Sequence, residues 1–205
     1  MRTSLVVPMI VIAVLDGCIV FSYRGSAALA AASQGDPAAK AEVVAAFERL
    51  NSAPSYRMKT SAPEGTTVLV EVVPPDKRHY VAQSPTRGTF EYIVVGTQTR
   101  ERVNMPGQPE GWRCTAKSRP LDTRFNLDRV KQNLTEVIRR PDTVIDGIPV
   151  HTYAPASGGG GALYVGVQTG LPRRMVLVDK QSGKTATIDF YDYGAPITIA
   201  LPPCG

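Results

Sequence analysis

The sequence has few of the residues on which catalytic and metal sites depend. Its 205 residues include two histidines and three cysteines, and neither His79 nor His151 belongs to a cluster of Cys, Asp and Glu with metal-ligand spacing. No serine occupies a Gly-x-Ser-x-Gly elbow, and no Lys-Ser/Thr pair follows the glycine run at 157–162. We therefore expect half-exposed structural histidines and no catalytic residue, metal or cofactor, which favours a protein that is not an enzyme.

Charged residues of one sign do not cluster along the sequence either. The 23 Lys and Arg residues are scattered among 18 Asp and Glu residues, for a formal net charge of +5. Nucleic-acid binding depends on a clustered basic surface, so we expect no nucleic-acid partner. Hydrophobic residues make up 43% of the chain, which is ordinary for a globular protein.

The N-terminus has the pattern of a secretion signal. Arg2 is followed by the apolar run LVVPMIVIAVLDGCIVF and then by small residues of the Ala-x-Ala kind. We predict a signal over residues 1–30, cleaved after Ala30 or a few residues later. A single mature domain, residues 31–205, would then be periplasmic or secreted.

Two other interpretations of this segment stay open. The apolar run approaches the length of a membrane-spanning helix, although Pro8 and Asp16 interrupt it, so the segment could remain as a membrane anchor. The sequence LDGC at 15–18 resembles the box that precedes a lipidated cysteine in bacterial lipoproteins. Cys18 would then carry the lipid, although Asp16 departs from that pattern.

Removal of the signal would leave two cysteines, Cys114 and Cys204. An even pair in an oxidising compartment suggests a disulfide, which would close a loop of about 90 residues. The alternatives are two free thiols or a bond between molecules.

The mature chain begins with a helical pattern and continues with strand patterns. Asp36 and Pro37 suit the start of an amphipathic helix, and short Val-, Thr- and Tyr-rich segments follow between turn residues from 55 to 104. Their spacing favours an antiparallel meander. Alternation predicts that one set of side chains points inward and lines a ligand cavity: Val68, Val70, Val72, Phe90, Tyr92 and Val94.

A second helix interrupts the strands. Asn126 or Asp122 could cap it, its apolar stripe would run from Leu127 through Val130 and Leu134 to Val137, and Pro141 would end it. Further strands are expected at 143–155, 162–168, 171–180, 184–193 and 196–202. In the turn at 169–172, Gly170 permits a positive φ and Pro172 suits a strand start.

This order of elements resembles the periplasmic lipoprotein-carrier superfamily, which comprises LolA-like proteins and lipid-binding lipoproteins of the LppX and LprG type. The phrases that carry the resemblance are VEVVPPDKRHYVAQ (70–83), EYIVVGTQTRERVN (91–104), GWRC (111–114), IDGIPVHTY (145–153), YVGVQTGLPRRMVLVDK (164–180) and IDFYDYGAPITIALPP (188–203). The resemblance implies an α+β fold. In it, a strongly curved antiparallel sheet forms a half-open β-barrel, with the N-terminal and inserted helices covering the concave side.

The resemblance also implies a function. It suggests a carrier or chaperone-like protein that holds a lipid or an acylated protein in an apolar cavity, without catalysis and as a monomer. The same architecture occurs in envelope sensors, so the alternative is a module that binds an envelope membrane protein while its own side chains fill the cavity.

Overall fold

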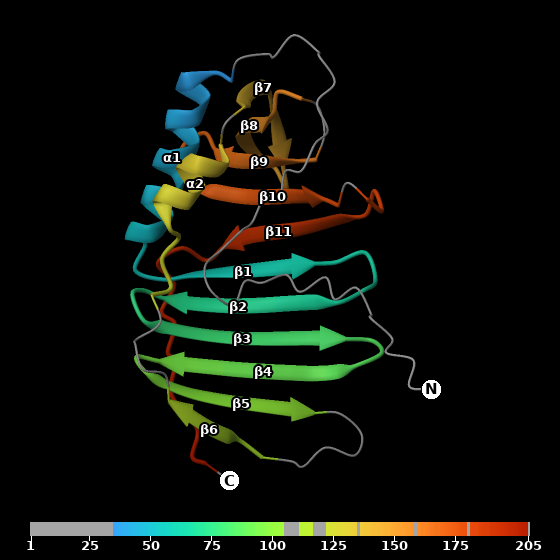
Figure 1. The fold of residues 1–205 in the computed structure, drawn as a ribbon. Helices are drawn as coiled ribbons and strands as arrows, with labels where there is room; N and C mark the ends of the chain where they lie inside the picture. The colour runs from blue at the N-terminus through green and yellow to red at the C-terminus, as the bar shows by residue number, and fades with distance from the viewer. Residues whose placement is uncertain are drawn as a thin grey trace.

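The computed structural model describes residues 35–104, 111–116, 122–134, 136–157, 160–179 and 181–204, and the predicted signal at 1–30 lies outside them. Within the described residues lie two helices and eleven strands (Figure 1). Their bounds are α1 Pro37–Ser52, β1 Tyr56–Ser61, β2 Thr67–Val73, β3 Lys77–Ser84, β4 Gly88–Val95, β5 Gln98–Asn104, β6 Arg113–Ala116, α2 Leu127–Asn133, β7 Val137–Ile145, β8 Ile148–Pro155, β9 Gly161–Gly166, β10 Pro172–Val178 and β11 Thr185–Tyr191.

The eleven strands of the described chain form one antiparallel sheet. Their order is β6-β5-β4-β3-β2-β1-β11-β10-β9-β8-β7, so each half of the sheet is a meander of consecutive strands. The two meanders meet where β1 pairs with β11 (Figure 1). The edge strands β6 and β7 lie at opposite ends, and the sheet therefore stays open. This confirms the predicted antiparallel half-barrel.

Helix α1 forms for reasons that are visible in its sequence. The side chain of Asp36 accepts a hydrogen bond from the backbone N–H of Ala38 at 2.8 Å, and Pro37 occupies the first turn, where no N–H donor is needed. One stripe of the helix is buried, consisting of Ala39, Val43, Ala46, Phe47 and Leu50. The backbone N–H of Asp36 donates to the carbonyl of Val137, which ties the start of the helix to the start of β7.

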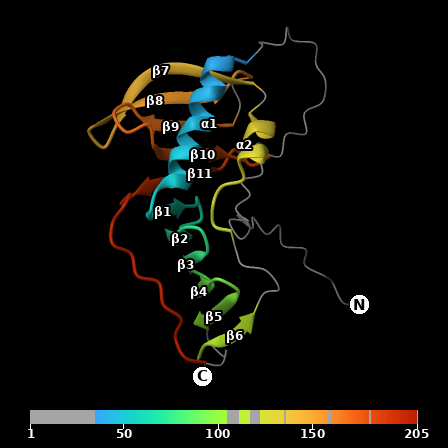
Figure 2. The ribbon, with the colours of Figure 1, turned by 90° about the vertical axis from the view of Figure 1, so that its left-hand side faces the viewer.

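The buried stripe of α1 packs on one face of the sheet, called here the inner face. The helix contacts β7, β9 and β10 and also α2 (Figure 2). The hydrophobic core lies between the helix and this face, and its sheet residues include Met58, Val70, Met175, Ile188 and Phe190. Both helices lie over the inner face, as the family resemblance implied (Figure 1).

The second helix is shorter than predicted. Asn126 caps it by accepting a hydrogen bond from the N–H of Arg129 at 3.0 Å, but the helix ends at Asn133, and Val137 belongs to β7. Val137 pairs with Pro155 of β8 and is buried, so strand pairing satisfies its backbone and its side chain together. Pro141 lies inside β7, at an irregularity of the ladder between Arg140 and Thr143, where a missing N–H is tolerated.

The sequence predicted one strand over 143–155, but this segment contains the end of β7, a turn and the whole of β8. Its chain reverses at Asp146 and Gly147, which have φ angles of 50° and 77°. These left-handed values suit a two-residue turn between β7 and β8, and Asp and Gly are residues that adopt them readily. The turn at 169–172 is as predicted, because Gly170 has a φ of 64° and β10 begins at Pro172.

The segment 196–202 is not a strand either. Residues 195–204, called here the C-terminal strap, run from the centre of the sheet to β6 on the side opposite α2 (Figure 2). The strap is held by a hydrogen bond from Ser55 Oγ to the carbonyl of Ala195 at 2.6 Å and by one from Arg100 Nε to the carbonyl of Pro202 at 3.1 Å. At its end Cys204 forms a disulfide with Cys114. Two prolines at 202 and 203 leave the strap few N–H donors for a ladder.

Candidate ligand-binding face

The six residues that the sequence predicted to point inward all lie on the inner face. Strand register arranges them in three rows that cross β2, β3 and β4. The rows are Val68–Ala82–Phe90, Val70–Tyr80–Tyr92 and Val72–Arg78–Val94. Val68, Val70, Val72 and Val94 are buried, whereas Phe90 and Tyr92 are half-buried. Their role as the lining of a ligand cavity stays a prediction.

Aromatic side chains gather on a half-buried part of the inner face. The ring centroids of Tyr80 and Phe90 are 6.1 Å apart in an edge-on arrangement, and those of Phe90 and Tyr92 are 6.4 Å apart and stacked. All three side chains are half-buried, and the small Ala82 lies beside them. Tyr80 and Ala82 were not predicted, although alternation along β3 places both on the same face as the predicted residues. We call Tyr80, Phe90 and Tyr92 the aromatic patch.

The inner face near α1 is filled by the protein's own side chains. The ring of Phe125 lies 5.1 Å from that of Phe47 and 6.5 Å from that of Phe190. Asn51 of α1 holds the backbone of Phe125, just before α2, in place. Its side-chain amide donates to the carbonyl of Phe125 at 2.8 Å and accepts from the N–H of Phe125 at 2.7 Å. The region under α1 is therefore a packed core, and the aromatic patch lies to one side of it.

One row of the inner face is polar although it is enclosed. Tyr56 and Arg78 are 1% and 4% exposed, and they flank Val72 in register. Burial raises the pKa of Tyr56 well above its usual range, and the charge of Arg78 offsets this only in part. Thr99, which follows Val94 in the same row, is also buried. This row borders the apolar rows and limits the apolar surface on that side.

Polar contacts also join α1 to the far end of the sheet. The hydroxyl of Tyr153 in β8 donates to Glu42 Oε2 at 2.5 Å, and Arg139 Nη1 lies 3.6 Å from the same oxygen. Burial, together with this hydrogen bond to a carboxylate, raises the pKa of Tyr153 far above its usual range. Arg139 also contacts Asp142 and His151. These contacts position α1 over β7 and β8.

The outer face of the N-terminal half carries a ladder of ion pairs. His79 lies between two carboxylates, with Nδ1 3.1 Å from Glu71 and Nε2 2.9 Å from Glu91. Arg57 pairs with Glu71 at 2.8 Å, and Arg102 pairs with Glu91 at 2.5 Å. Partial burial acts to raise the pKa of both glutamates, but the hydrogen bonds from His79 and the arginines outweigh it and lower the pKa values. Arg57 also pairs with Asp192 at 2.7 Å, so every carboxylate in the ladder has a cationic partner.

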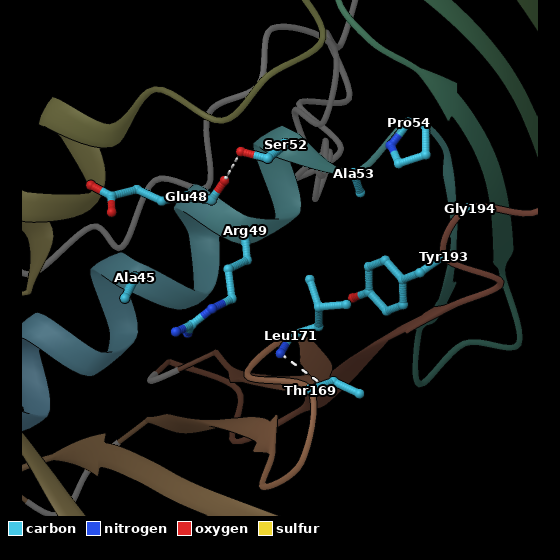
Figure 3. Close-up of a pocket in the computed structure, with 10 residues that line it drawn as sticks. All are labelled: Ala45, Glu48, Arg49, Ser52, Ala53, Pro54, Thr169, Leu171, Tyr193 and Gly194. Carbon is cyan, nitrogen blue, oxygen red and sulfur yellow. Dashed lines mark hydrogen bonds between the residues drawn. The ribbon is translucent and has the colours of Figure 1, made fainter.

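The described chain has a second concave feature, a cleft of about 490 Å³ beside the C-terminal half of α1 (Figure 3). The cleft lies between the helix, the β9–β10 turn and the residues that follow β11. Its hydroxyl groups bond within the protein: Ser52 donates to the carbonyl of Glu48 at 2.9 Å, Thr169 accepts from the N–H of Leu171 at 3.2 Å, and Tyr193 donates to the carbonyl of Pro172. The hydroxyl groups of the cleft are therefore paired within the protein, and its charged lining consists of Glu48 and Arg49 (Figure 3). The cleft is small and partly polar, so the inner face is the stronger candidate site for an apolar ligand.

The described residues contain no group of three His, Cys, Asp or Glu side chains that could hold a metal ion. Both histidines have about a quarter of their side chains exposed and contact carboxylates, so each is part of an ion-pair cluster. No helix in the described part of the chain is long and apolar enough to cross a membrane.

Two solved structures resemble this architecture over most of the chain. LprF from Mycobacterium bovis matches with a TM-score of 0.57 and 15% sequence identity over 84% of this chain and 100% of that one. The lipoprotein LppX from Mycobacterium tuberculosis matches with a TM-score of 0.60 and 14% identity over 81% of this chain and 100% of that one. The chain therefore has the fold of LppX and LprF. No protein-family model and no curated protein sequence matches it.

At 14–15% identity these similarities show a shared fold and carry no residue roles to this chain. The two similar structures are covered along their whole length, so the chain spans the complete LppX-type unit. What this chain binds must therefore be argued from its own inner face.

Proposed function

We propose that the protein is an exported carrier that holds an acyl chain, of a lipid or of an acylated protein, against the inner face of its half-barrel. The aromatic patch is the observation that carries this proposal. Its three half-buried rings adjoin the buried valines of β2, so the apolar surface continues from the core outward. A contiguous apolar surface that the protein's own side chains cover only in part commonly marks a binding site.

The energetics favour an acyl chain as the occupant. Each methylene group that leaves water contributes about 0.8 kcal/mol, and the rings of the patch supply flat apolar surface for it. Retention of a chain in this way depends on apolar area and requires no reactive group, so the protein needs no catalytic residues for this task.

A steric block at the patch tests the proposal. Ala82 lies beside Phe90 on the inner face, and its neighbour Val81 points to the outer face of the same strand. The substitution Ala82→Trp should place an indole where the acyl chain lies, whereas Val81→Trp adds the same group on the other side. Uptake of a fluorescent fatty acid should fall sharply in the first variant and stay at the wild-type level in the second.

Native ligands give an independent measurement. Solvent extraction of the purified protein, followed by mass spectrometry, should recover acyl lipid from the wild type and from Val81→Trp, and little from Ala82→Trp. Both variants should keep the circular dichroism spectrum of the wild type. Absence of lipid from the wild type, together with no fatty-acid uptake, would contradict the proposal.

A specific observation favours a second candidate function. The packing of Phe47, Phe125 and Phe190 shows that part of the inner face is closed by side chains. A module of this kind could bind an envelope membrane protein and carry no lipid. Affinity capture from an envelope extract distinguishes the two functions, because a stoichiometric protein partner without lipid would support the module.

The proposed location depends on the N-terminal segment. Export with cleavage near Ala30 predicts a mature protein that starts near Ala31, is free in the periplasm or medium and is monomeric. Intact-mass measurement of protein from its native envelope tests this. A mass that retains Met1 would indicate a membrane anchor, and a mass that begins at a modified Cys18 would indicate a lipoprotein.

A further inference from the structure

Exposed aliphatic side chains gather at the end of the β7–β8 hairpin. Among the described residues the exposed large hydrophobic side chains are Leu69, Val144, Ile148 and Val167, and the last three lie together. Val144 is the cross-strand partner of Pro149, whose carbonyl accepts a hydrogen bond from the N–H of Val167 at 3.1 Å. Ile148 begins β8 directly after the turn. We call Val144, Ile148, Pro149 and Val167 the apolar tip.

The tip lies far from the part of β7 that α1 holds. The helix is tied to Val137, the first of the nine residues of β7, and the turn follows the last of them, about 26 Å away along an extended strand. Figure 2 shows β7 and β8 arching away from the helix toward their turn. The exposure of Val144 is 60%, the highest of the four exposed aliphatic side chains, so the described fold leaves the tip uncovered.

Strand pairing with a partner is a poor explanation for the tip. The edge strand β7 contains Pro141, which has no N–H donor, and its ladder is irregular between Arg140 and Thr143. Charged residues at 139, 140 and 142 further discourage the addition of a strand. An occupant must therefore contact the side chains of the tip and not the backbone of β7.

The tip also has no unpaired charge of its own. Asp146 at the turn lies 3.6 Å from Arg174, and Arg174 is bonded in turn to Asp189 at 2.5 Å. Asp146 thus has a cationic partner in the sheet, while its side chain stays 72% exposed. A charged partner surface would gain little here, and an apolar environment is the better match.

The size of the tip decides between a protein and a membrane. A stable protein interface buries about 800 Å² on each partner, far more than a few partly exposed aliphatic side chains supply. A bilayer needs no matching surface, since each apolar group that enters it gains in proportion to its own area. We propose that the apolar tip inserts into a lipid bilayer and docks the protein on a membrane surface. This proposal concerns a site separate from the inner face and does not depend on the proposed carrier function.

A tryptophan at the tip reports insertion directly. The full chain carrying Val144→Trp is compared with the full chain carrying Leu69→Trp, because Leu69 is an exposed aliphatic residue on the outer face of β2. Vesicles of phosphatidylcholine are added, and the emission of unsubstituted protein, which contains one tryptophan, is subtracted. The new tryptophan at 144 should shift to the blue and be quenched by brominated lipid, and the one at 69 should do neither.

Serine substitutions measure the strength of docking. The double variant Val144→Ser and Val167→Ser should partition onto the same vesicles about tenfold more weakly than the wild type, because apolar area has been removed. Leu69→Ser should partition as the wild type does. These positions are exposed, so the melting temperatures should agree.

Three results would overturn the proposal. The first is equal emission behaviour at 144 and 69, and the second is equal partitioning of the double serine variant and the wild type. The third is binding that needs anionic lipid and disappears between about 0.05 and 0.5 M salt, which would mark an electrostatic contact elsewhere. If the tip binds a protein partner and does not insert into lipid, the tryptophans at 144 and 69 should behave alike with vesicles, which is the first of these results. The Ala82→Trp variant should dock normally, which separates this outcome from failure of the carrier function.

Discussion

Removal of the disulfide between Cys114 and Cys204 should destabilise the protein and release the strap. The bond joins β6 to the penultimate residue across a Cα–Cα distance of 5.9 Å and a sequence separation of 90. The other described contacts of the strap end are few, with one hydrogen bond from Arg100 to Pro202. Ile199 is 9% exposed, so part of the strap also packs on the sheet.

The magnitude follows from the length of the loop. In the chain-entropy model a loop of about 90 residues lowers the entropy of the unfolded chain by about 15.5 cal/mol/K, which corresponds to about 4.6 kcal/mol at about 298 K. Native disulfides commonly contribute about 2–5 kcal/mol when removed. We expect a loss of about 2–4 kcal/mol, and thus a fall in melting temperature of roughly 5–15 °C for a domain of this size.

Urea unfolding of the wild type and of the double variant Cys114→Ser and Cys204→Ser measures this loss. The wild type with reductant should match the variant, and Cys18→Ser should match the wild type because it leaves the pair intact. Amide exchange of residues 196–201 should become faster in the variant while α1 keeps its protection. A loss below about 1 kcal/mol, or two reactive thiols beyond Cys18 in denatured unreduced protein, would refute the reasoning.

Three further predictions concern the sheet and its cover. Val70→Asp should lower the free energy of unfolding by several kcal/mol, since the side chain is 2% exposed and the charge would be unpaired; an unchanged melting temperature would show that the face is assigned wrongly. Glu71 and Glu91 have lowered pKa values because the hydrogen bonds from His79 and the arginines outweigh burial. Their stabilisation is therefore present above pH 4.5 and lost as the pH falls through the folded values; the variant Glu71→Gln and Glu91→Gln should show a flatter acid-unfolding profile, and an unchanged profile would count against this. Asn51→Ala should cost about 1–3 kcal/mol in urea unfolding, since it leaves two partly buried backbone groups of Phe125 without partners, and equal stability with the wild type would show that water replaces the amide.

The parts of the fold that are encoded locally could be predicted from the sequence. Helix α1 was found because its cap, its proline and its apolar stripe all lie within one segment. The inward set of β2 was found because alternation survives any choice of neighbour strand, and Val68, Val70 and Val72 are indeed buried together. The pairing of β1 with β11 could not be predicted in this way, because it joins residues more than 120 positions apart.

Two segments adopt a structure that differs from their local sequence pattern, because contacts with residues far away in the chain determine it. Leu127, Val130, Leu134 and Val137 fit a helical stripe, but Val137 gains a strand partner in Pro155 that no local pattern shows. The segment 196–202 has the composition of a strand, but the strap leads to Cys204, whose bond to Cys114 fixes its end beside β6. Both errors arose because β-structure depends on a partner, whereas a helix satisfies its backbone within itself.

The position of the strap follows from the unequal cover of the sheet. Helix α1 supports the inner side of β7, β9 and β10, while the aromatic patch on β3 and β4 stays half-buried. This half of the sheet, β1 to β6, has one face partly open to water and so has fewer buried contacts that oppose local unfolding. Its edge strand β6 is only four residues long. The strap crosses the outer side of this same half, from Ser55 before β1 to Arg100 in β5 and Cys114 in β6. The strap therefore stabilises, on the outer face, the strands that the helices cover least. The inner face of these strands can stay partly uncovered while the sheet keeps its structure.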